Sequence, residues 1–88
     1  MTFNTYLNYD VKPFSWRSKA VRLDEGTTLR DLNRLLGVTT ICEYNPLTDR
    51  ARGWNRNPRF MLRSGFWYHV DLEDSSKLAD LEPGIYLK

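Results

Sequence analysis

The sequence predicts a single small α+β domain with one α-helix, over residues 28–36, on a mostly antiparallel sheet. Segments in which apolar and polar residues alternate predict strands on both sides of the helix. A stripe of leucines at helical spacing predicts the helix itself. At 88 residues the chain is too short for two hydrophobic cores. Strands arranged around one helix in this order are typical of α+β layers.

The first two strands are expected to form a hairpin. Residues 3–11 place apolar or β-branched side chains at every second position, and Tyr6 interrupts the polar face between them. This period of two indicates a strand with one buried face. Pro13 has no N–H to donate to a ladder, and the chain becomes extended again at residues 20–23. We therefore expect the two segments to pair through a wide connection.

The predicted helix has signals at both of its ends. Gly26 interrupts the preceding strand. Thr27 or Thr28 can cap the helix, and Asp31 stands three residues after Thr28, in a capping-box position. Gly37 suits the left-handed conformation that often ends a helix, which limits the helix to about ten residues. Its apolar stripe consists of Leu29, Leu32, Leu35 and Leu36.

The rest of the chain consists of turns and extended segments. Residues 38–44 are rich in β-branched side chains and predict a third strand, which Asn45 and Pro46 close. Turn-forming residues crowd the stretch 47–58, which we expect to be irregular. The later predicted elements are extended segments at 60–62 and 66–72, a helical turn at 75–81 and a short terminal strand at 85–88.

The stretch from Val21 to Leu32, a strand followed by a turn and a capped helix, resembles part of ubiquitin-like β-grasp modules. The closing section from Leu72 to Leu87 is similar to the end of that fold, so the resemblance covers most of the chain and implies a β-grasp-like fold. Modifiers of this family end in Gly-Gly, whereas this sequence ends in Leu87 and Lys88. The iron–sulfur members need four cysteines. Neither conjugation nor an iron–sulfur cluster is therefore expected.

A second set of residues resembles the LysM carbohydrate-binding module. The residues that carry this resemblance are Val21, Gly26, Thr28, Leu29, Leu32, Gly37, Asn45 and Pro46. It implies a glycan groove bordered by Gly26, Thr27 and Asn45. Only seven residues separate Gly37 from Asn45, which is short for the second helix of a LysM module. Both resemblances, and another small α+β fold, therefore stay open.

Cys42 and His69 are the only cysteine and the only histidine. A lone cysteine can form neither an intrachain disulfide nor a four-thiolate metal site. The pair could act as nucleophile and base if their strands adjoin, but a cysteine in an apolar strand more often packs as a small hydrophobe. The sequence also has no phosphate-binding loop or nucleophile elbow. We therefore expect no enzyme activity, cofactor, metal or small-molecule substrate.

The expected location is cytoplasmic, either a host cytoplasm or an intracellularly assembled virion. A free thiol in a small domain fits a reducing compartment. The N-terminal segment has neither the basic start nor the apolar run of a signal peptide. Nowhere is there a stretch of about 18 apolar residues that could span a bilayer. We therefore expect no contact with a membrane.

Charge is distributed unevenly along the chain, although the total is only +2. Residues 50–63 contain five arginines and no acidic residue, whereas residues 66–88 carry a net charge of −3. Arginine and tryptophan are among the side chains most enriched at the energetic centres of interfaces. The predicted partner-binding residues are therefore Arg50, Arg52, Trp54, Arg56, Arg59 and Arg63. Trp16 and Trp67 could extend this surface or belong to the core.

Three interpretations of the basic loop stay open. It can dock on an acidic protein surface, bind nucleic-acid phosphates while Trp54 stacks on a base, or pair with the acidic C-terminal segment. We predict a non-enzymatic small interaction protein that docks this loop on a larger partner. It would be a structural subunit of an assembly, such as a viral particle, or an inhibitor or effector of a host complex. The alternatives are a LysM-like glycan-binding module and a nucleic-acid-binding protein.

Overall fold

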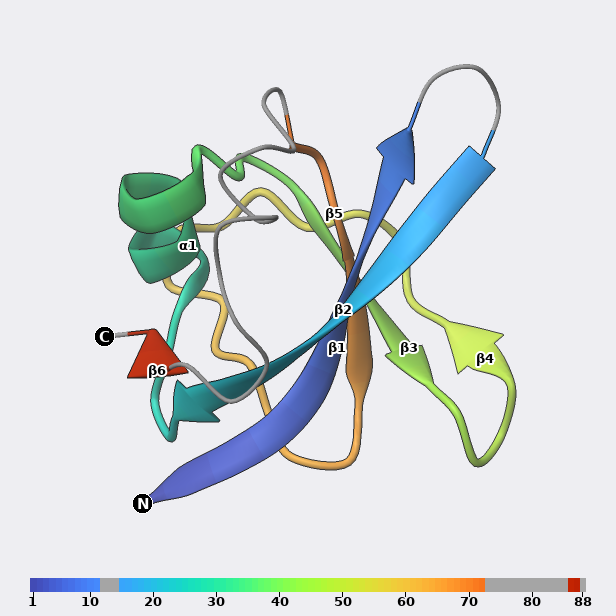
Figure 1. The fold of residues 1–88 in the computed structure, drawn as a ribbon, viewed down its shortest axis with the longest axis horizontal. Coiled ribbons are helices and arrows are strands. Elements are labelled where there is room, and N and C mark those ends of the chain that lie inside the picture. Colours follow the sequence, from blue (N-terminus) through green and yellow to red (C-terminus); the bar gives the residue numbers. More distant parts are fainter. Residues whose placement is uncertain (12–14, 73–85, 88) are drawn as a thin grey trace.

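A mixed β-sheet dominates the structure of the protein (Figure 1). The computed structural model describes residues 1–11, 15–72 and 86–87. Within these residues the elements are β1 (Thr2–Val11), β2 (Ser15–Asp24), α1 (Leu29–Leu36), β3 (Ile41–Asn45), β4 (Arg50–Ala51), β5 (Trp67–Val70) and β6 (Tyr86–Leu87). The strands lie in the order β4-β3-β5-β1-β2-β6. In Figure 1, α1 lies to the left of the sheet, and β3 and β4 reach away to the right.

The longest pairing is the antiparallel hairpin of β1 and β2. It runs without a break from Thr2 opposite Asp24 to Val11 opposite Ser15. The predicted hairpin is therefore confirmed, but the expected wide connection is wrong, because β2 starts at Ser15 and only three residues, 12–14, separate the two strands. On its other side β1 pairs with β5 in parallel. β3 then pairs antiparallel with both β5 and β4. β6 adds a short parallel strand along the outer edge of β2.

The predicted fold class, a mostly antiparallel, β-grasp-like sheet with one helix over 28–36, is wrong. Two of the five strand pairings are parallel, so the sheet is mixed. In the described part of the chain α1 is the one helix and contributes only eight residues, and the small globule is roughly α+β without a clear β-grasp arrangement. The reason is that side-chain alternation identifies a strand but does not specify its direction or its neighbours. The long connections between strands determine the direction and the neighbours of each strand.

The caps of α1 agree with the expectation. Thr28 is the N-cap, and its backbone N–H donates a hydrogen bond of 2.9 Å to Asp31 Oδ2. This hydrogen bond, more than any other contact, lowers the pKa of the Asp31 carboxyl. At the other end Gly37 has a φ of 77°, and its N–H donates to the Asn33 carbonyl. Leu35 is the exception in the leucine stripe, because it is exposed.

One face of the sheet, together with α1, encloses the core. The odd-numbered residues of β1 from Phe3 to Tyr9 are buried, as are Val21 and Leu23 on β2. The other core residues come from α1, the segment after it, and the region around β5: Leu29, Leu32, Leu36, Val38, Ile41, Leu62, Tyr68 and Val70. Because side chains alternate along a strand, the even-numbered residues of β1 lie on the opposite face of the sheet.

The remaining expected elements are met in part. The stretch 47–58 is largely irregular but contains the short strand β4. Residues 60–62 do not form a strand, and Met61 instead makes a single bridge to Thr28. This bridge brings the loop before β5 against the start of α1. The terminal strand is present as β6, and the expected helical turn at 75–81 lies outside the described residues.

Replacing Gly37 by alanine tests the C-cap of α1. No atom lies within 4 Å of the position that an added Cβ would take, so the cost comes only from the left-handed backbone. We expect Gly37→Ala to lower the free energy of unfolding by about 1–2 kcal/mol in urea denaturation. Gly53→Ala is the matched control, because its surroundings are equally open and its φ is ordinary. Equal effects of the two substitutions would contradict the assignment of the cap.

Candidate binding surface

The face of the sheet that turns away from the core carries a row of aromatic rings. Tyr44 on β3 stands opposite Trp67 on β5, and their ring centroids are 5.7 Å apart. The Trp67 ring also meets Tyr6 of β1 edge-on at 5.3 Å. The three rings come from adjacent strands, and each occupies an outward-facing position. The strand register therefore assembles a continuous aromatic strip across the middle of the sheet.

A second row, of polar residues, runs beside the aromatic strip. His69 on β5 lies between Asn8 on β1 and Cys42 on β3. Ser18 on β2 donates a hydrogen bond to the side-chain oxygen of Asn8. His69 Nε2 lies 3.1 Å from Asp10 Oδ1. The polar groups of this row are thus joined to one another or to the neighbouring strand, which holds the row in place.

The two rows form the floor of a hollow of about 490 Å³, which we call the aromatic groove. Its lining consists of Tyr6, Asn8, Trp16, Ser18, Cys42, Tyr44, Ala51, Trp54, Trp67 and His69. Trp54 comes from the loop after β4, and its ring meets His69 edge-on at 5.6 Å. Trp16 and Trp54 are 62% and 55% exposed. Tryptophans this exposed on one face are typical of a surface that binds a ligand or another protein.

Cys42 behaves as a packed thiol within this groove. Its Sγ lies 2.8 Å from the backbone carbonyl oxygen of Arg52, as a donated hydrogen bond requires. Burial raises the pKa of the thiol, which disfavours the nucleophilic thiolate. Although Cys42 and His69 are direct neighbours across β3 and β5, these observations favour the small-hydrophobe interpretation. In the described part of the chain no group of three or more His, Cys, Asp or Glu side chains could hold a metal ion.

A buried carboxylate, Glu43, lies on the other face of β3. Its side chain is only 2% exposed. Oε1 accepts a hydrogen bond of 2.7 Å from Arg63 Nη2, and Oε2 accepts one of 2.9 Å from the Tyr68 hydroxyl. The ion pair with Glu43 raises the pKa of Arg63, and burial raises that of Tyr68. The carboxylate is therefore compensated by a charge and by a hydroxyl donor.

Three arginines and Glu43 line a second hollow, of about 510 Å³, which we call the arginine groove. Its lining consists of Glu43, Asn45, Thr48, Arg50, Ala51, Arg52, Arg63 and Phe66. The Arg63 guanidinium lies over the Phe66 ring, 4.3 Å from its centroid. Ala51 belongs to the lining of both grooves. The strand β4 is therefore the ridge that separates them.

The structure distributes the six predicted binding residues over different places. Arg50, Arg52 and Arg63 share the arginine groove, whereas Trp54 lies in the aromatic groove. Arg56 lines a smaller hollow beside α1 together with Arg30. Arg59 is exposed in the turn that precedes residue 60. Their role in binding stays a prediction, but they do not act as one continuous patch.

The structure also shows where the residues of two alternative interpretations lie. Most of the acidic C-terminal segment lies outside the described residues, and within them Arg52 and Arg63 form ion pairs with Glu43 instead. Of the residues that the LysM resemblance would place at a glycan groove, Thr27 is buried, and its hydroxyl donates to the Asp24 carbonyl. Gly26 is an exposed turn residue, and Asn45 lines the arginine groove.

Sequence reasoning did not single out Tyr6, Asn8, Tyr44 or Glu43 as site residues. The available signal was Tyr6, an aromatic residue at a strand position that should be polar. The open-face neighbours of Tyr6 could not be identified, because they depend on the parallel pairing of β1 with β5. Glu43 stands in an apolar strand, and only the approach of Arg63 and Tyr68 reveals its role.

Comparison with family models, with curated proteins and with solved structures finds no match to this chain. Within residues 1–11, 15–72 and 86–87, no helix has the length and the apolar character needed to cross a membrane. The candidate site is therefore defined by geometry: an aromatic groove and an arginine groove on the two sides of β4.

Removing the Tyr68 hydroxyl tests the arrangement around Glu43. This hydroxyl donates to the buried carboxylate and accepts the backbone N–H of Arg63 at 2.7 Å. We expect Tyr68→Phe to lower the free energy of unfolding by about 1–3 kcal/mol, because the substitution leaves buried polar groups without a partner. Tyr44→Phe is the control, since its hydroxyl bonds Asp49 at the surface. If chemical denaturation shows that both variants lose the same free energy of unfolding, the hydrogen bonds of the Tyr68 hydroxyl make no specific contribution to stability.

Proposed function

We propose that this protein is a non-enzymatic docking module that binds an acidic protein surface. The observation that carries the proposal is the position of Trp54. The loop after β4 brings this ring onto the aromatic groove. Arg50, in β4, and Arg52, directly after it, line the arginine groove on the other side of the strand. An apolar side chain of the partner would enter the aromatic groove, and acidic side chains around it would meet the arginines.

The size of the aromatic surface supports a protein partner. Tyr6, Trp16, Trp54 and Trp67 are each more than a third exposed on one face. A buried aromatic side chain removes about 150–250 Å² from water, and burial is favourable by about 25 cal/mol per Å² of apolar surface. Tryptophan and tyrosine are also rigid, so little side-chain entropy is lost on binding. A few such rings can therefore supply most of the affinity of an interface.

The distribution of charge favours an acidic protein over nucleic acid. Among the residues that the structure describes, the lining of the aromatic groove contains no arginine or lysine, and Arg50, Arg52 and Arg63 line the hollow on the other side of β4. Bases stacked on the tryptophans would therefore have their phosphates away from the cations that such binding needs. A folded partner with an apolar centre and an acidic rim matches both grooves at once.

The other parts of the predicted function fit the same surface. A structural subunit of an assembly and an inhibitor of a host complex would each dock through these grooves. The packing of Cys42, whose Sγ donates to the Arg52 carbonyl and whose pKa burial raises, fits a protein that does not use this thiol as a nucleophile. We include a cytoplasmic location in the proposal, because a free thiol persists in a reducing compartment.

A peptide selection tests the proposal and does not require the natural partner to be identified. We expect random peptides displayed on phage and selected on the wild-type protein to be enriched in Asp and Glu around an aromatic or aliphatic residue. Trp54→Ala should weaken the selected peptides by about tenfold or more, because it removes a wall of the aromatic groove. The readout is the change in tryptophan fluorescence during titration.

The control for this experiment is Leu47→Ala, which removes an apolar side chain that is 91% exposed and does not line the aromatic groove. It should leave the affinity unchanged. Selected peptides without acidic residues, or peptides that bind the Trp54 variant as well as the wild type, would refute the proposal. Tighter binding of oligo-dT than of any selected peptide would favour the nucleic-acid alternative.

A further inference from the structure

The arginine groove contains more positive charge than its own carboxylate neutralises. Three guanidinium groups, of Arg50, Arg52 and Arg63, line it together with one carboxylate, Glu43. Arginine stays protonated at any physiological pH. The lining that the described residues provide therefore has a net charge of +2 when Glu43 is ionised.

The three arginines are not equivalent. Arg63 is held in place, because its Nη2 donates to Glu43 at 2.7 Å and its guanidinium lies over the Phe66 ring. The Nε atom of Arg52 lies 3.9 Å from the same carboxylate, which is beyond hydrogen-bond distance, and its side chain is 72% exposed. In the described part of the chain no carboxylate forms an ion pair with Arg50. The donors of Arg50 and Arg52 are thus available at the mouth of the groove.

We infer that Arg50 and Arg52 form a subsite for a carboxylate side chain, an Asp or Glu of the bound partner, in the arginine groove. Arg63 stays on Glu43 and supports the wall of the subsite. The guanidinium groups present planar pairs of N–H donors, which match the two oxygens of a carboxylate. This inference rests on the proposed function and deepens it, because it names the chemical group that the partner inserts on this side of β4.

The position of Glu43 provides a directional test of the subsite. This buried carboxylate repels an incoming anion and occupies Arg63. Replacing it by glutamine raises the net charge of the groove lining from +2 to +3 and weakens the hold on Arg63, because a neutral amide oxygen accepts less strongly from a guanidinium than a carboxylate does. The subsite hypothesis therefore expects Glu43→Gln to bind a carboxylate ligand more tightly. Damage to the fold would disperse the groove, so the gain in affinity is expected of Glu43→Gln protein that is shown to be folded.

The experiment titrates the full chain with hexaglutamate at low ionic strength and follows the Nε–Hε signals of the arginines by NMR. We expect the signals of Arg50 and Arg52 to shift most. The double variant Arg50→Gln, Arg52→Gln should bind hexaglutamate about tenfold more weakly or worse, and Glu43→Gln severalfold more tightly. Physiological salt should weaken binding to the wild type, because these groups are exposed.

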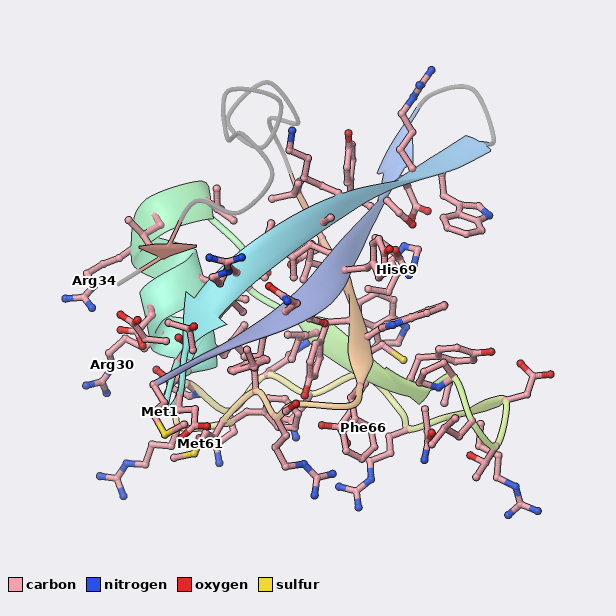
Figure 2. All side chains as sticks on the ribbon, turned by 60° about the horizontal axis from the view of Figure 1, so that its bottom comes forward. Met1, Arg30, Arg34, Met61, Phe66 and His69 are labelled. Atoms are coloured by element: carbon pink, nitrogen blue, oxygen red, sulfur yellow. The ribbon has the colours of Figure 1, made fainter. Side chains whose placement is uncertain are left out.

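A double variant on α1 provides the matched control. Arg30→Gln together with Arg34→Gln removes the same charge from side chains that project into solvent from α1, on the side of the molecule away from His69 (Figure 2). If this control weakens hexaglutamate as much as the Arg50, Arg52 variant does, binding follows total charge and the subsite is refuted. A Glu43→Gln variant that is folded but binds no more tightly also refutes it.

Two further ligands and one further variant separate the remaining possibilities. Hexaglutamine, which keeps the backbone and loses the charge, should not bind. Inorganic phosphate that displaces hexaglutamate with higher affinity would show a general oxyanion site and overturn the carboxylate assignment.

Trp54→Ala separates this inference from the proposed function. If the tryptophan variant loses the displayed peptides but binds hexaglutamate normally, both stand. If the selected peptides bind the Trp54→Ala variant as tightly as the wild type, while hexaglutamate binding still requires Arg50 and Arg52, only the proposed docking function fails.

Discussion

The Glu43 carboxylate, buried between β3 and the segment that leads into β5, places a constraint on the whole centre of the sheet. A buried charge is costly unless it is paired and hydrogen-bonded, and here Arg63 and the Tyr68 hydroxyl meet that need. The same hydroxyl accepts the Arg63 backbone N–H, so residue 63 is held both by its side chain and by its backbone. Just before β5, the Phe66 carbonyl accepts the Thr5 hydroxyl. These contacts tie β3, β5 and β1 together.

With β5 held between β1 and β3, the alternation of side chains determines both faces of the sheet at once. Leu7, Tyr68 and Ile41 point into the core, whereas the residues next to them in the chain point outward. The outward positions carry Tyr6, Trp67 and Tyr44, among others, so the strand register that builds the core also builds the aromatic strip. Because α1 packs on the core side, the described part of the chain leaves the aromatic face open.

The strand β4 is short, but it connects the two kinds of surface. It consists of Arg50 and Ala51, and Arg52 follows it. Along these three residues the side chains point alternately to the two faces of the sheet edge. Ala51 pairs with Tyr44 and lines both grooves, and the arginines on either side of it line the arginine groove alone. Apolar burial and charge recognition are thus adjacent at one edge but separated by the backbone. Such an arrangement suits a partner that brings an apolar anchor and acidic neighbours, and it is poorly suited to a polyanion that needs both on the same side.

Local features of the chain were determined by the sequence alone. The cap residues Thr28 and Gly37 and the hairpin of the first two strands are readable because each depends on neighbours a few residues away or on strict alternation. The concentration of arginine and tryptophan in residues 50–63 is likewise a sequence property.

Only the tertiary structure decided which strands are neighbours and which side chains share a groove. The parallel alignment of β1 with β5 joins Asn8 to His69 across 61 residues, and the pairing of Glu43 with Arg63 spans 20. The bridge between Ile41 and Asn55 fixes the chain next to Trp54, and Trp54 and Arg52 lie in grooves on opposite sides of β4. No periodicity encodes such a partition, because it depends on the path of the chain between the elements.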